Sequence, residues 1–70
     1  MENKDKVCVA IHKIKPNTEF AFLGDIVTEK DFNKIKWVVG VDSENASITT
    51  TTNPHSEITW SLFKAEYDKL

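Results

Sequence analysis

The sequence predicts a small α+β domain with a four-stranded antiparallel sheet covered by a short helix and a C-terminal helix, in the order β-β-α-β-β-α. Three observations lead to this prediction. Residues 6–14 and 37–41 are rich in β-branched and aromatic side chains, which favour strands. Residues 28–36 begin with helix-capping chemistry. Residues 58–70 space their aromatic side chains as a helix does.

The N-terminal third is predicted to form a β-hairpin within a single domain that spans residues 1–70. Residues 1–5 are polar and are expected to fray. Residues 6–14 predict a strand in which Val7, Val9 and Ile11 share one face. The other face is apolar too in the first half, which is therefore expected to be buried on both sides. A turn is expected at Pro16-Asn17, followed by the return strand over residues 19–23.

The central third is predicted to contain a short helix and a second hairpin. Thr28 and Asp31 have the spacing of a capping box, in which each side chain bonds to the backbone of the other. The helix gives way to a strand over residues 37–41. A turn over residues 42–45 then leads into a threonine-rich strand over residues 48–52, before Asn53-Pro54 ends it.

The last helix is predicted to begin at Ser56 and to present two apolar faces. One face comprises Trp60, Phe63, Tyr67 and Leu70. The other comprises Ile58, Leu62 and Ala65. A small sheet covers only one face, so the second face is a candidate partner-binding surface. The alternative is that the first turn is not helical, so that Ile58 points elsewhere.

The threonine tract supplies a second candidate surface, with Thr49 and Thr51 as the residues expected to contact a partner. An exposed strand with few charges accepts another strand through its backbone hydrogen bonds. The alternative is an ordinary solvent-facing edge strand, in which threonine is a favoured residue.

Composition argues against several classes of function. The chain has nine lysines, no arginine and a net charge of −2, so it lacks the usual side chain for gripping phosphates. Cys8 is the only cysteine, which excludes an internal disulfide. On a strand, Cys8 and His12 would lie about 13 Å apart, too far for one ion. With His55 as the only other soft ligand, no metal site, cofactor or catalytic group is expected.

The sequence therefore predicts a small non-enzymatic protein-interaction or self-assembling module. Its residue usage is typical of AT-rich genomes, as in phage accessory and structural proteins. The expected partner is another protein or a second copy in preference to nucleic acid, with no membrane and no evident small-molecule substrate. The expected location is the cytoplasm, or the virion for a phage protein. The alternative is a weak nucleic-acid-binding module that uses its lysines and the aromatic residues Phe20, Phe22 and Trp37.

Overall fold

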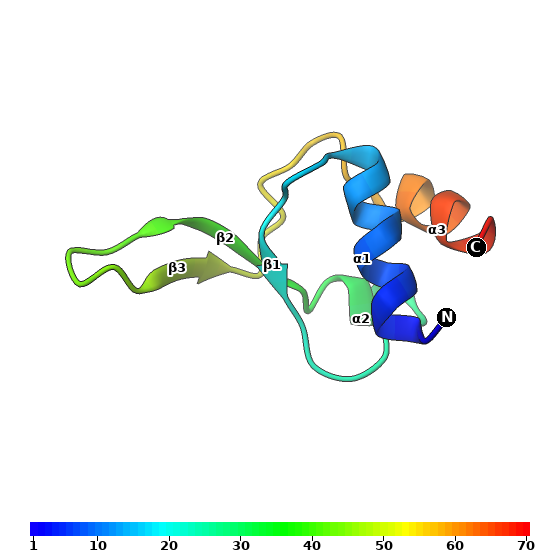
Figure 1. Cartoon of the computed structure of the whole chain (residues 1–70), viewed down its shortest axis with the longest axis horizontal. Helices are drawn as coiled ribbons and strands as arrows, with labels where there is room; N and C mark the ends of the chain where they lie inside the picture. Colours follow the sequence, from blue (N-terminus) through cyan, green and yellow to red (C-terminus); the bar gives the residue numbers. More distant parts are fainter.

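The chain folds into three helices and a three-stranded antiparallel sheet, in the order α-β-α-β-β-α (Figure 1). The computed structural model describes all residues, 1–70. The elements are α1 (Asn3–Ile14), β1 (Phe20–Ala21), α2 (Glu29–Phe32), β2 (Lys36–Val41), β3 (Ser47–Thr50) and α3 (Trp60–Asp68). The α+β class is confirmed, whereas the fourth strand and the predicted element order are wrong.

The first element is a helix, α1, and not the predicted strand over residues 6–14. Alternating apolar residues suggested a strand, but the same segment also places apolar residues at the spacing of a helix. Three of them, Val7, Ala10 and Ile11, are buried in the core. Packing of this face outweighs the β-propensity of valine and isoleucine, which amounts to about 1 kcal/mol at most. Residues 3–5, which were expected to fray, belong to this helix.

The turn after α1 is confirmed. Lys15 is extended because it precedes Pro16, and this conformation ends the helix. Asn17 has a left-handed φ of 66°, a conformation that asparagine tolerates well. The return strand is shorter than expected, because β1 contains only two residues, which pair with Trp37 and Lys36 of β2.

The capping box of the central helix is confirmed. The Thr28 hydroxyl accepts a hydrogen bond from the Asp31 N–H at 3.2 Å, and the Asp31 carboxylate accepts one from the Thr28 N–H at 3.0 Å. The helix α2 that follows has only four residues. Its Phe32 side chain is buried and contacts the rings of Trp37, Trp60 and Phe63.

The second hairpin is also confirmed, since β2 pairs with β3 in antiparallel register. Asp42 closes its turn by accepting hydrogen bonds from the N–H groups of Glu44 and Ala46 at 2.8 and 3.0 Å. Asn45 takes the left-handed conformation in this turn, with a φ of 64°. The strand ends at Thr50 and not at Thr52, because the Thr50 hydroxyl turns back to accept from the Thr52 N–H.

The C-terminal helix α3 begins at Trp60 and not at Ser56. Thr59 is its N-cap, because its side chain accepts a hydrogen bond from the Leu62 N–H at 3.2 Å. Ile58 therefore precedes the helix and is buried. The core joins residues from all three helices, from β2 and from the segments between elements. It consists of Val7, Ala10, Ile11, Ile26, Phe32, Ile35, Trp37, Ile58 and Phe63.

Candidate protein-interaction site

The outer part of the β2–β3 hairpin projects from the body of the molecule as an arm, defined here as residues 39–48 (Figure 1). The helices gather at the opposite end. This separation makes the molecule elongated, with extents of 40 × 23 × 20 Å. β1 pairs only with the base of β2, at Lys36 and Trp37, so the arm itself is two-stranded.

The pairing pattern determines which backbone groups of β3 face its open edge. The Val38 N–H donates to the Glu19 carbonyl, so Val38 turns its backbone groups towards β1. Backbone groups alternate in direction along a strand. Thr49, directly opposite Val38, therefore turns its own N–H and C=O away from β2. No strand lies on that side of β3, because the sheet order is β1-β2-β3.

The arm exposes large apolar side chains. Val39, Val41 and Ile48 are 51%, 63% and 45% exposed, respectively. Ile48 lies opposite Gly40, which has no side chain to cover it. The only charged residues of the arm are Asp42 and Glu44, both in the turn at its tip. An open strand edge beside uncharged, partly apolar side chains is suited to pairing with another chain.

The two threonines predicted as contact residues have different positions. Thr49 is exposed, lies within β3 and presents its backbone to the open edge. Thr51 is exposed too, but it lies beyond the end of the strand, in a bend. Thr49 therefore occupies the position that strand pairing requires, and Thr51 lies at its margin.

The second apolar face predicted for the C-terminal helix does not form. Ile58 is 1% exposed and belongs to the core, so it cannot contact a partner without unfolding. Leu62 and Ala65 are exposed on α3, as expected for that face. The helix that carries them, α3, lies at the opposite end of the molecule from the arm (Figure 1). The structure therefore does not bring the five predicted contact residues together.

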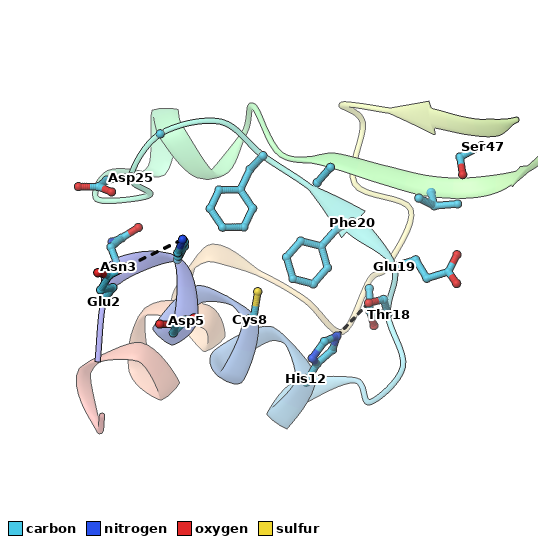
Figure 2. Close-up of a pocket in the computed structure, with 15 residues that line it drawn as sticks. Glu2, Asn3, Asp5, Cys8, His12, Thr18, Glu19, Phe20, Asp25 and Ser47 are labelled. Carbon is cyan, nitrogen blue, oxygen red and sulfur yellow. Dashed lines mark hydrogen bonds and ion pairs between the residues drawn. The ribbon is translucent and has the colours of Figure 1, made fainter.

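A groove between α1 and β1 is a second surface, and sequence reasoning missed it because α1 was interpreted as a strand (Figure 2). Cys8 and His12 lie one helical turn apart on α1 and both line it. The earlier separation of about 13 Å between them, which assumed a strand, is wrong. The His12 Nε2–H donates to the Thr18 carbonyl at 2.9 Å. No third histidine, cysteine or carboxylate joins the pair to form a cluster for a metal ion.

Comparisons with known proteins assign the chain to no family. Comparison with protein-family models, with curated protein sequences and with solved structures finds no match to this chain. None of its helices has the length and the apolar character that crossing a membrane requires.

Proposed function

We propose that this protein is a small non-enzymatic interaction module that assembles with a second copy of itself through the open edge of β3. The observation that supports the proposal is the outward-facing backbone of Thr49 on a strand that has no neighbour on its outer side. An added strand would satisfy these groups with hydrogen bonds. Two copies would then join their three-stranded sheets into one continuous sheet.

β3 lacks the features that usually block pairing at an open edge, and the charges of the arm favour an antiparallel pairing of two β3 strands. Natural proteins protect open edges with lysine, proline or a bulge. β3 has neither lysine nor proline, and the irregularity in the hairpin lies in β2, at Val39. In an antiparallel pair the two tips point in opposite directions. The carboxylates of Asp42 and Glu44 on one copy therefore stay away from those on the other.

The nucleic-acid alternative gains little support from the positions of its aromatic residues. Trp37 is 1% exposed and packs against Phe32 and Phe20, so its ring is not available to stack on a base. Phe20 and Phe22 are half-buried in a groove lined by acidic side chains, which would repel phosphates. Self-assembly through protein contacts is the better supported proposal.

The test is a pair of substitutions at Thr49, compared by sedimentation velocity up to millimolar protein concentration. Thr49→Pro removes the outward-facing N–H without removing a hydrogen bond to β2, and proline is tolerated at such edge positions. Thr49→Val keeps the N–H and the β-branched shape. We expect the wild type and Thr49→Val to form dimers and Thr49→Pro to remain monomeric.

Two results would contradict the proposal. One is a wild-type protein that stays monomeric at every concentration. The other is a Thr49→Pro variant that dimerises as readily as the wild type. Circular dichroism of all three proteins checks that the proline variant keeps its fold, so that loss of association is not mistaken for unfolding.

A further inference from the structure

The groove between α1 and β1 is an open hollow of about 1160 Å³, which Val38 of β2 and Ser47 of β3 also line. Its base is apolar. The rings of Phe20 and Phe22 lie nearly parallel, with an interplanar angle of 13° and centroids 6.1 Å apart. The Phe20 ring points towards α1, where the Cys8 thiol points back towards it (Figure 2). A side chain that entered here would contact aromatic and sulfur surfaces on both sides.

Acidic side chains stand at both ends of this apolar base. Glu2, Asp5 and Asp25 lie at one end and Glu19 at the other (Figure 2). Lys4 is the only lysine in the lining. The groove therefore holds four of the eleven acidic residues of the chain and one of its nine lysines. A chain with a net charge of only −2 has concentrated its negative charge here.

Most of these carboxylates are not neutralised within the molecule. Glu2 forms an ion pair with Lys4 at 3.9 Å. Asp5, Glu19 and Asp25 have no ion pair. These carboxylates would therefore attract a positively charged group on a partner without competition from a neighbouring lysine of this chain.

The backbone of β1 adds a third element of recognition. Residues 18–22 line the groove, and β1 is an edge strand with β2 on one side only. The Glu19 carbonyl bonds to the Val38 N–H, so the next residue, Phe20, turns its N–H and C=O away from β2. An extended segment lying along β1 can bond to these groups.

We propose that this groove binds an extended, lysine- or arginine-rich segment of a partner protein. The segment would lie along the free edge of β1, place an apolar side chain against Phe20 and Phe22, and pair its cationic groups with Glu19 and Asp25. The arm of a second copy of this chain is not a suitable occupant of the groove, because Asp42 and Glu44 make the tip of the arm acidic. The segment would use the free edge of β1 rather than that of β3, although Ser47 of β3 also lines the groove.

The test uses two short synthetic peptides that alternate phenylalanine with lysine in one and with glutamate in the other. Binding is followed by two-dimensional NMR and by the rate at which N-ethylmaleimide alkylates Cys8, the only cysteine. We expect the lysine peptide to shift the Phe20 and Phe22 signals and to slow alkylation. Equal protection by the glutamate peptide, or no binding of the lysine peptide at millimolar concentration, would overturn the proposal.

A charge-reversed variant tests the electrostatic part. Glu19→Lys with Asp25→Lys should weaken lysine-peptide binding roughly tenfold at low salt, as loss of two rim charges does. Glu44→Lys, at the distant arm tip, is the control and should bind like the wild type. If the double variant is unfolded, the wild type at raised salt provides the same test. Unchanged affinity in a folded double variant, or at raised salt, would overturn the proposal.

The Thr49→Pro variant distinguishes this groove from the edge of β3. It should bind the lysine peptide as tightly as the wild type does. Loss of peptide binding in the folded proline variant would show that the peptide uses the arm, and would overturn the assignment to the groove.

Discussion

Asn3 holds both backbone polar groups of Ile26 with its side-chain amide. Its Oδ1 accepts a hydrogen bond from the Ile26 N–H and its Nδ2 donates to the Ile26 carbonyl, each at 2.9 Å. Nδ2 also donates to the Tyr67 hydroxyl at 2.9 Å. One side chain therefore connects the start of α1, the loop before α2 and the end of α3. This contact fixes one wall of the α1–β1 groove.

Replacing Asn3 should destabilise the whole domain. Asn3→Ala leaves the backbone groups of buried Ile26 without partners, which typically costs about 1–3 kcal/mol. Urea unfolding measures the loss. Asn33→Ala is the matched control, because Asn33 is exposed and its side chain forms no hydrogen bond, so a change within about 0.5 kcal/mol is expected. A free energy of unfolding that is the same for both variants would contradict the role of Asn3.

Protonation of the Asp31 carboxylate in acid should lower the free energy of unfolding. Hydrogen bonds from the Thr28 N–H, the Val27 N–H and the Thr28 hydroxyl hold the pKa of Asp31 below its ordinary value of 3.8. The contribution of this carboxylate is therefore complete above that ordinary value and is lost as the pH falls through the lowered pKa. Urea unfolding across this pH range should show a steeper acid loss in the wild type than in Asp31→Asn. Identical pH profiles would contradict the assignment.

Ile58 and Leu62 should differ in their effect on folding. Ile58→Val shortens a side chain that is 1% exposed and should cost about 0.5–1.5 kcal/mol. Leu62→Ala truncates a side chain that is 50% exposed and should change stability by about 0.5 kcal/mol or less. Thermal unfolding of the two variants checks this order. A larger loss for Leu62→Ala would mean that α3 packs through the other face.

Local chemistry made the central part of the fold predictable. The capping box of Thr28 and Asp31 depends on residues three positions apart, and the turn at Asp42 on residues within four. Such contacts are visible in sequence because no distant part of the chain takes part in them. The β2–β3 hairpin follows from the same local signals.

Tertiary packing decided the elements that were predicted wrongly. Val7 and Ile11 fit both a strand and a helix pattern, and α1 forms because α3 is available to pack against it. The start of α3 depended on whether Thr59 or Ser56 capped it, and burial of Ile58 accompanies the later start. Nothing in the local sequence distinguishes these outcomes.

The candidate surfaces likewise combine features that the local sequence predicts with features that depend on the tertiary structure. Thr49 could be singled out from sequence because a threonine-rich, uncharged strand suggests an open edge. The direction of its backbone could not, since that depends on the hydrogen bond from Val38 to Glu19. The groove was hidden for a similar reason, because its two walls come from α1 and β1 and meet only in the folded chain.

Amide hydrogen exchange at Thr49, measured over a range of protein concentrations, tests the proposed edge pairing most directly. Thr50, whose backbone faces β2, should exchange slowly at every concentration. The Thr49 amide should exchange quickly in dilute protein and more slowly as the concentration rises, because pairing with a second β3 protects it. A Thr49 amide that exchanges at one rate across the whole range would contradict the account.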